Sequence, residues 1–455
     1  MNSIKYIDLF MKINELNKNQ KLSSHELKLL QEKKFKKLLA HALTHSKFYK
    51  NYYGERGITI DKINEISLED LPIIDKKIVM ENYDDLICDQ VLKRKDVEEF
   101  INNPSNVNKK YKNNYNVICS SGSSGEVGIF AYSLKEWNYI KALNIQRTSK
   151  SKLRLFSKIK VAFIGNVYGN YAGVSLTKEL PKLFTKTIAV NINSPIGEIR
   201  SQVDKFQPEI LTGYASGIFT LAQEQLKGNI NIKPTKILCS GEVLNDHMRS
   251  EIKNAFGIEP INLYAASESL GMASECQEHN KLHLFTDLYK FEVVDKELKP
   301  VLPGNSGNLI LTNLFNYTQP LIRYRMNDEV ILDDNLCECG SPFPILKSIS
   351  GRQDEFLWFE KSDATREFIH PSIIRGSYVD GVDKIKVIQT SMNSLLIKAI
   401  SNGKEENIIN NIKIKINEIL QSKGLDKDVT FSVEIVSKLE NDKKTGKYKL
   451  IVPFK

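Results

Sequence analysis

Short β-prone segments alternate with helical patterns between residues 158 and 268, and this alternation constrains the fold more than any other feature of the sequence. The β-prone segments are KIKVAFIG (158–165), KTIAVNI (186–192), PEILTGY (208–214), TKILCSGE (235–242) and EPINLYAASE (259–268). Helical patterns lie between them at Ser194 to Gln207, Phe219 to Lys227 and Asp246 to Phe256. Strands that alternate with helices form a parallel sheet with helices on its faces. We therefore predict an α/β fold for this region.

The pattern changes twice after this region. FEVVD, GNLILTNL and DEVILDD follow with almost no helical periodicity, which predicts an antiparallel β subdomain. Beyond about residue 352, two strand-like segments, a helical pattern over 404–424 and a further alternating segment predict a small α+β unit. We accordingly predict a large N-terminal domain over 1–351 and a small C-terminal domain over 352–455.

Composition and charge exclude several classes of protein. No run of about 18 apolar residues is present, so we predict no membrane span. Charged residues from Lys5 to Glu15 interrupt the region where a signal peptide would be apolar, and six cysteines make no disulfide framework. We expect a cytoplasmic protein. The net charge of +9 suits an anionic ligand such as a nucleotide and does not require a nucleic acid. The oligomeric state stays open, and a homodimer is compatible with the sequence.

A serine- and glycine-rich loop follows a strand-like segment in VICSSGSSGEVGIF (117–130). It contains Ser120, Ser121, Gly122, Ser123, Ser124 and Gly125. Glycines let backbone N–H groups turn toward an anion, and hydroxyls add donors, so such a loop suits a polyphosphate. The Walker A and dinucleotide-binding patterns are both absent. Taken alone, the loop is also compatible with a flexible surface segment.

This loop resembles the phosphate loop of the adenylate-forming superfamily, which contains acyl-CoA synthetases, adenylation domains and luciferases. Further motifs follow in the order of that superfamily: Tyr264-Ala265-Ala266-Ser267-Glu268, Tyr324-Arg325-Met326-Asn327-Asp328, Gly351-Arg352-Gln353-Asp354-Glu355 and Thr445-Gly446-Lys447. The compact length and the Cys-x-Cys-Gly segment at 337–340 are most similar to the phenylacetate–CoA ligase group, including its capsule-biosynthesis members. Glu126 and Val127 depart from the usual lysine and proline of the loop.

The resemblance implies an ATP and AMP site with Mg²⁺. The loop Ser120–Gly125 would hold the β- and γ-phosphates, and Glu268 would ligate Mg²⁺ through its oxygens. Tyr264 would lie flat on the adenine, with the backbone of Ala265, Ala266 and Ser267 and the Gly241–Glu242 turn beside it. Asp328 would accept hydrogen bonds from the ribose hydroxyls. Arg352 would reach the nucleotide or the domain junction, and for Arg325 a phosphate contact and a structural ion pair stay open.

The resemblance also implies a mobile C-terminal domain. Lys447 would be the catalytic lysine that reaches the substrate carboxylate and the α-phosphate. Asp354 would be the hinge at which the small domain rotates between adenylation and thioester formation.

The implied activity is that of an ATP-dependent carboxylate ligase, which forms an acyl-adenylate and then an acyl thioester with CoA. A second interpretation passes the acyl group to a carrier-protein thiol or to an amine, for example an amino sugar of a surface polysaccharide. A third is a nucleotide-binding protein without catalysis.

A Cys/His set predicts a structural zinc site. Cys276, His283, Cys337 and Cys339 supply the three thiols and one imidazole that suit tetrahedral Zn²⁺. His279 is an alternative fourth ligand, and unligated thiols are the alternative to a metal site.

Tyrosines in two loops after predicted strands are candidates for the wall of an acyl pocket. Tyr168 and Tyr171 lie in GNVYGNYAG (165–173), and Tyr214 lies in GYASG (213–217). Loops at the carboxyl ends of parallel strands are where ligands bind. A place in the ordinary core is equally compatible with these tyrosines.

Overall fold

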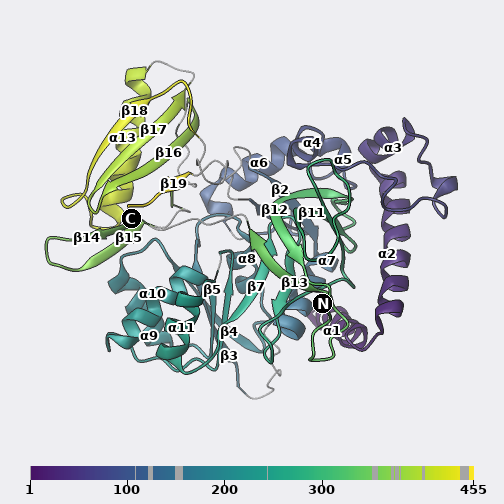
Figure 1. Ribbon diagram of the computed structural model, residues 1–455, viewed down its shortest axis with the longest axis horizontal. Coiled ribbons are helices and arrows are strands. Elements are labelled where there is room, and N and C mark those ends of the chain that lie inside the picture. The colour runs from purple at the N-terminus through teal and green to yellow at the C-terminus, as the bar shows by residue number, and fades with distance from the viewer. Residues whose placement is uncertain are drawn as a thin grey trace.

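The computed structural model describes residues 2–107, 109–120, 127–148, 157–242, 244–350, 357–369, 373–374, 379, 381–401, 405–440 and 450–454. Figure 1 shows a large part, coloured purple to green, and a smaller part formed by the last elements of the chain. The α/β architecture predicted from the sequence is confirmed.

The large part is built on a mixed 11-stranded sheet in the order β10-β11-β12-β13-β9-β8-β7-β6-β5-β3-β4. Its parallel half contains β3 (Ile159–Gly165), β4 (Thr185–Asn191), β5 (Ile210–Tyr214), β6 (Lys236–Ser240) and β7 (Ile261–Ala266). Each of these strands overlaps a β-prone segment, so the predicted parallel sheet is confirmed.

Antiparallel strands continue this sheet. The three predicted segments form β10 (Tyr289–Val294), β11 (Ser306–Asn313) and β12 (Tyr324–Leu332). The sheet also contains β8 (Leu270–Glu275), β9 (Leu282–Leu284) and β13 (Ile345–Ser350), which were not part of that prediction. The direction reverses at β7 and β8, because a short turn joins these neighbours and allows only antiparallel pairing.

One face of the parallel half packs against three helices, α9 (Ile196–Phe206), α10 (Ala215–Leu226) and α11 (Asp246–Phe256). Gly213 lets β5 approach β3, because a Cβ at this position would lie 2.0 Å from the Ile164 carbonyl oxygen. The other face is covered in part by α8 (Ala172–Lys178). The helix begins inside the segment 165–173, which was predicted to be a loop.

The N-terminal third is mainly helical. Its helices are α1 (Asn2–Asn19), α2 (Ser24–His45), α3 (Lys47–Gly54), η1 (Ile60–Lys62), α4 (Lys76–Glu81), α5 (Tyr83–Leu86), α6 (Arg94–Asn102) and η2 (Pro104–Asn106). The hairpin of β1 (Tyr115–Cys119) and β2 (Ile129–Ser133) follows, and then α7 (Leu134–Leu143) and the π-helical turn η3 (Asn144–Thr148). These elements share one large hydrophobic core with the antiparallel half of the sheet.

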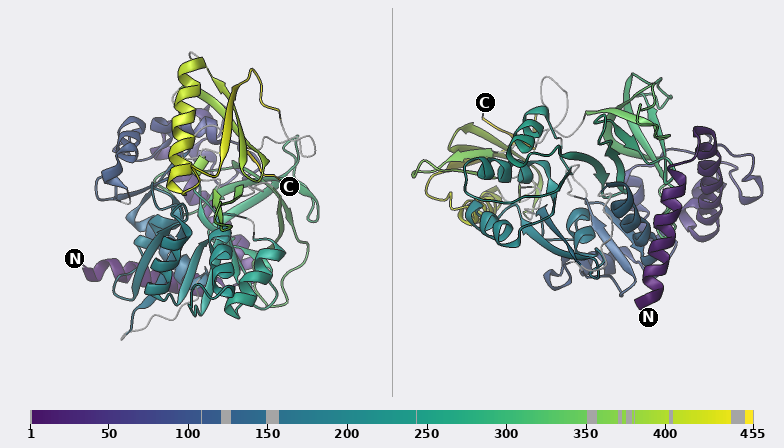
Figure 2. Two further views of the ribbon diagram at one scale, coloured as in Figure 1. Left: turned by 90° about the vertical axis from the view of Figure 1, so that its left-hand side faces the viewer. Right: turned by 90° about the horizontal axis from the view of Figure 1, so that it is seen from below.

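The smaller part has a hydrophobic core of its own. It contains β14 (Leu357–Glu360), β15 (Arg366–Ile369), β16 (Val382–Ser391), β17 (Ser394–Ser401), α13 (Glu405–Ser422), β18 (Thr430–Ile435) and β19 (Ile451–Val452). Figure 2 shows this yellow-green unit beside the teal α9–α11 region. The predicted boundary at 351/352 lies outside the described residues and stays a prediction.

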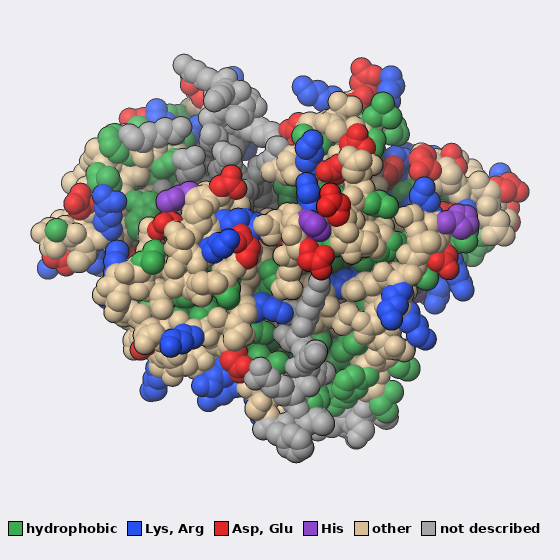
Figure 3. All heavy atoms as spheres, turned by 60° about the horizontal axis from the view of Figure 1, so that its bottom comes forward, with side chains coloured by type: hydrophobic (Ala, Val, Ile, Leu, Met, Phe, Trp, Pro, Cys, Tyr) green, Lys and Arg blue, Asp and Glu red, His purple; other side chains and the backbone are tan. Residues whose placement is uncertain are grey.

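Basic and acidic side chains are interspersed on the face shown in Figure 3, so the net charge of +9 is not concentrated there. Among the described residues, no helix combines the length and the apolar character needed to cross a membrane.

Candidate active site

A cavity of about 250 Å³ reaches the edge of the sheet at which the parallel strands end. Residues that follow β1, β6 and β7 contribute to its wall at this edge. This is where an open α/β sheet binds ligands, because the loops after neighbouring strands meet there. Most of the candidate nucleotide residues that the structure describes lie around this opening.

Ser120 fixes the two ends of the serine- and glycine-rich loop. Its backbone N–H donates to the Gly128 carbonyl at 2.8 Å, and its Oγ accepts from the Gly128 N–H at 2.7 Å. Ser120 lines the cavity. The remaining loop residues, Ser121 to Gly125, lie outside the described residues, so phosphate binding by this loop stays a prediction.

Glu268 is a buried carboxylate in the cavity wall, with only 5% of its surface exposed. The Tyr324 hydroxyl lies 3.4 Å from its Oε1. The preceding residue, Ser267, donates through Oγ to the Cys119 carbonyl at 3.1 Å and accepts from the Tyr132 hydroxyl at 3.0 Å. These contacts fix the turn after β7 against the end of β1, so Glu268 and Ser120 border the same cavity.

Tyr264 and Asp328 lie next to each other, although 64 positions separate them in the sequence. The Tyr264 hydroxyl donates to Asp328 Oδ2 at 2.7 Å, and both residues are buried. Leu263 and Ala265, on either side of Tyr264, line the cavity, whereas Tyr264 and Asp328 do not. Adenine stacking by Tyr264 and ribose binding by Asp328 therefore stay predictions.

The Gly241–Glu242 turn borders the cavity after β6. Gly241 has φ +76° and lies against the Tyr214 ring, which a Cβ would approach to 3.2 Å. Glu242 Oε2 accepts from the Ser216 N–H at 3.1 Å, in the first turn of α10. This hydrogen bond holds the turn after β6 against the start of α10.

Tyr171 and Tyr214 line the cavity, as the acyl-pocket interpretation requires. Burial raises the pKa of Tyr171, so its hydroxyl stays neutral. The prediction that Tyr168 lines the pocket is wrong, because its side chain is 70% exposed and lies outside the wall. The Tyr168 N–H donates to Asn166 Oδ1 at 3.1 Å, and this local turn sets the direction of the loop.

Lys76 is a cavity residue that the sequence analysis missed. It begins α4, after Asp75, whose side chain accepts from the Ile78 N–H at 3.0 Å. The segment before α4 pairs with β12, since the Arg325 N–H donates to the Ile74 carbonyl at 2.8 Å. Arg325 Nη2 lies 3.1 Å from Asp75 Oδ2. Arg325 therefore forms the structural ion pair that was one of its two predicted roles.

The other candidates, Arg352, Asp354 and Lys447, lie outside the described residues. Their nucleotide, hinge and catalytic roles stay predictions.

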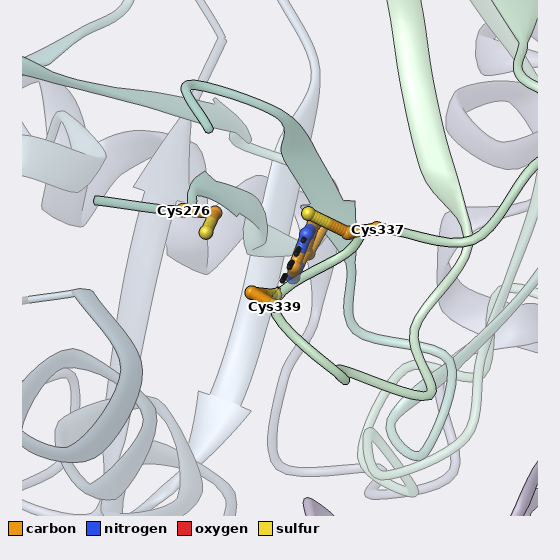
Figure 4. A group of neighbouring side chains, drawn as sticks. Cys276, Cys337 and Cys339 are labelled. Carbon is orange, nitrogen blue, oxygen red and sulfur yellow. Dashed lines mark hydrogen bonds between the residues drawn. The ribbon is translucent and has the colours of Figure 1, made fainter. Parts of the chain in front are cut away.

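The predicted Cys/His set comes together at one point (Figure 4). Ligand atoms of Cys276, His283, Cys337 and Cys339 all lie within 4.8 Å of one another. Cys276 follows β8, His283 lies in β9, and the two other cysteines lie between β12 and β13. His283 supplies the imidazole of this group; His279 does not belong to it.

The donor set fits a tetrahedral metal. Burial raises the pKa of the Cys276 thiol, but the backbone amides of Glu278 and His279 and the neighbouring thiols bring it below its ordinary value. Burial raises the pKa of Cys339 to about 12. A bound cation would offset the repulsion between neighbouring thiolates.

Comparisons with known proteins agree with the sequence motifs. The chain is 24% identical over 415 residues to protein CapK of Staphylococcus aureus, covering 85% of this chain and 82% of that protein. It is also 24% identical over 347 residues to the phenylacetate–coenzyme A ligase of Thermus thermophilus, covering 74% and 72%. No family model matches the chain.

Solved structures show the same fold. A 2-hydroxyisobutyryl-CoA ligase, in complex with 2-HIB-AMP and CoA, has a TM-score of 0.65 at 18% identity, over 95% of this chain and 91% of that chain. The same ligase in a postadenylation state has a TM-score of 0.61 at 18% identity, over 96% and 92%.

The chain is similar in sequence to phenylacetate–CoA ligases and CapK, and its fold is similar to that of a CoA ligase. These findings confirm the resemblance inferred from the sequence, including the group within the superfamily.

Proposed function

We propose that the chain is an ATP-dependent carboxylate ligase that forms an acyl-adenylate and then an acyl-CoA thioester. The observation that carries this proposal is that Ser120, Gly241–Glu242 and Ala265–Glu268 border one cavity at the edge of the parallel sheet. Several curated relatives are named phenylacetate–CoA ligases, which supports the same chemistry.

In the first half-reaction, the substrate carboxylate attacks the α-phosphorus of ATP and pyrophosphate leaves. The protein has to align the reactants and offset negative charge, with little covalent work of its own. Glu268 is our candidate ligand for Mg²⁺, because hard cations prefer oxygen ligands and this carboxylate borders the cavity. Lys76 supplies positive charge to the wall of the same cavity.

In the second half-reaction, a thiol attacks the acyl carbonyl and AMP leaves. Lys447 and Asp354 keep their proposed roles as the catalytic lysine and as the hinge of a rotating C-terminal domain. A 2-hydroxyisobutyryl-CoA ligase of this fold has been solved in postadenylation and thioesterification states.

The Cys276, His283, Cys337 and Cys339 group is our candidate for a structural Zn²⁺ site. All four coordination positions would be protein ligands, which is typical of a structural role. The metal would join the end of β8, β9 and the β12–β13 connection.

The two half-reactions are tested separately. Carboxylate-dependent exchange of pyrophosphate into ATP reports the adenylate, and AMP release upon addition of CoA reports the thioester. AMP release with a carrier-protein thiol or an amine, and none with CoA, would support the ligase function with an acyl acceptor other than CoA. A folded chain that binds ATP but exchanges with no acid would contradict the ligase.

A further inference from the structure

The cavity extends far beyond the edge at which the nucleotide candidates lie. Along β5, alternate residues Ile210, Thr212 and Tyr214 line it from the first residue of the strand to the last. Along β3, Ile159, Val161 and Phe163 line the same stretch, since Val161 pairs with Ile210 and Phe163 pairs with Thr212. Four residue steps along a strand span about 13 Å. The cavity is therefore a channel that runs along the sheet, away from the nucleotide end.

The channel is polar at one end and apolar at the other. Ser120, Glu268 and Ser240 lie at the nucleotide end. Ile159, Ile210 and Pro181 are buried at the far end. Such a gradient suits a ligand with a charged head and an apolar tail.

Three of the four threonines that line the channel donate their hydroxyls within their own segments. Thr177 donates to the Gly173 carbonyl at 2.9 Å, and Thr148 donates to the Asn144 carbonyl at 2.7 Å. Thr185 donates to the Pro181 carbonyl at 3.0 Å. A ligand does not have to offer acceptors to these three hydroxyls, so this part of the wall is compatible with a tail without polar atoms.

The two faces of the same strands are packed differently. On the face away from the channel, β3, β5 and β6 share one core with α9, α10 and α11. On the channel face, Ile159, Val161, Ile210 and Leu238 belong to a small buried cluster that is separate from the large core. Protein interiors contain few voids larger than a water molecule, so an open space beside this apolar cluster indicates a site for an apolar ligand group.

Another part of the wall is formed by α8 and the residues that follow it. Ala172, Leu176 and Leu180 line the channel at a spacing of four residues. This spacing puts the side chains of Ala172 and Leu176 on one face of α8, and Leu180 follows just after the helix ends. An engineered apolar cavity of about 150 Å³ holds a benzene ring. The present cavity measures about 250 Å³ with its nucleotide end included, and it extends along the strands.

We infer that the carboxylic acid substrate is an unbranched alkyl acid of medium length, such as octanoate or decanoate, and that an aryl acid is a poor substrate. This inference rests on the proposed ligase function. The carboxylate would lie at the Ser120 and Glu268 end, and the alkyl tail would follow β5 toward Ile210. A single aromatic ring would leave the far half of the channel empty.

The test is pyrophosphate exchange by the full chain with acetate, butyrate, octanoate, decanoate, benzoate and phenylacetate. We expect exchange to rise along the alkyl series and to exceed exchange with either aryl acid by about 10-fold or more, since each buried methylene favours binding. Exchange with phenylacetate or benzoate equal to that with decanoate would overturn the inference. The proposed ligase function would still be supported by such a result.

Thr212→Phe should block the channel halfway along β5. We expect it to abolish exchange with decanoate and to retain exchange with butyrate. The matched control is Thr187→Phe, since Thr187 lies on the same face of the neighbouring part of the sheet but does not line the channel. Equal decanoate exchange by the two variants, both folded, would overturn the inference.

Calorimetric titration with decanoate alone separates the inference from the ligase. If no acid supports exchange, the proposed function fails. Decanoate binding by the wild type and its loss in Thr212→Phe would then still support the alkyl site. No decanoate binding by the wild type would overturn it.

Discussion

The Nζ of Lys423 lies 3.2 Å from Oε1 of Glu367, and neither side chain has more than 2% of its surface exposed. The same ammonium donates to the carbonyls of Ile192 and Ser194, at 3.4 and 3.1 Å, in the connection after β4. The Ile196 N–H lies 3.4 Å from Glu367 Oε2. One buried ion pair of the small unit therefore contacts the large part of the chain.

Lys423→Met should destabilise the protein by about 3–5 kcal/mol, because it leaves the Glu367 carboxylate buried without its cation. Burial already lowers the pKa of Lys423, in keeping with a site poor in solvent. The measurement is urea unfolding followed by circular dichroism. The double variant Lys423→Met/Glu367→Leu should recover much of the loss. A single variant within about 0.5 kcal/mol of wild type, as for a surface substitution, would contradict this prediction.

Asp287 should make the stability depend on acid pH. Arg147 Nη1 and Nη2 each lie 2.6 Å from a different oxygen of its carboxylate, and Asn19 Nδ2 donates to it at 2.8 Å. Burial opposes ionisation, but Arg147 and Lys34 hold the pKa of Asp287 below its ordinary value. A carboxyl with a lowered native pKa stabilises the fold above its unfolded pKa of about 3.9, and this contribution is lost as pH falls through the native pKa.

Asp287→Asn should therefore be less stable than wild type near neutral pH, and the difference in unfolding free energy should shrink below about pH 4. Urea unfolding over a pH series measures it. Asp295→Asn, in an exposed turn, is the control for general acid effects. A difference that stays constant down to about pH 3 would show that the carboxylate charge does not matter.

Lys76→Met should slow pyrophosphate exchange by about 100-fold, the scale expected when one stabilising group is removed from developing charge. Lys77→Met is the matched control, because Lys77 is the next residue of α4, is exposed and pairs with Glu81 at 3.8 Å. Equal exchange rates for the two variants would exclude Lys76 from the reaction. Circular dichroism verifies that both variants are folded.

Cys337→Ser should remove bound metal and lower stability. We expect about one zinc ion per chain in wild-type protein purified without chelators, as for a closed four-ligand site. Cys88→Ser is the control, since Cys88 lies outside the Cys/His group. Metal analysis that finds no zinc in the wild type, or equal zinc in Cys337→Ser, would refute the site.

The alternation of β-prone and helical segments was enough to predict the parallel sheet, because each strand is apolar and each helix has one apolar face. The continuation of the sheet beyond β7 was harder to predict. It depends on the hairpin pairing of Leu263 with Ser274, which periodicity does not reveal. The start of α8 at Ala172 was missed because glycines on both sides of it are typical of a loop.

The motifs predicted most of the candidate site, since Ser120, Gly241 and Glu268 border one cavity. Lys76 could not be predicted, because its place beside the cavity depends on long-range contacts such as the pairing of Ile74 with Tyr324. The residue type of Tyr168 did not predict its position correctly, because local hydrogen bonds determine where a loop side chain points.

The most direct test of the central claim is carboxylate-dependent ATP–pyrophosphate exchange by wild type and Glu268→Gln, with Glu278→Gln as an exposed control. The proposed ligase predicts exchange by wild type and by the control, and a loss of at least about 100-fold in Glu268→Gln that is greatest at limiting Mg²⁺. Full exchange by Glu268→Gln at limiting Mg²⁺ would contradict the metal role, and no exchange by the folded wild type with any acid would contradict the ligase itself.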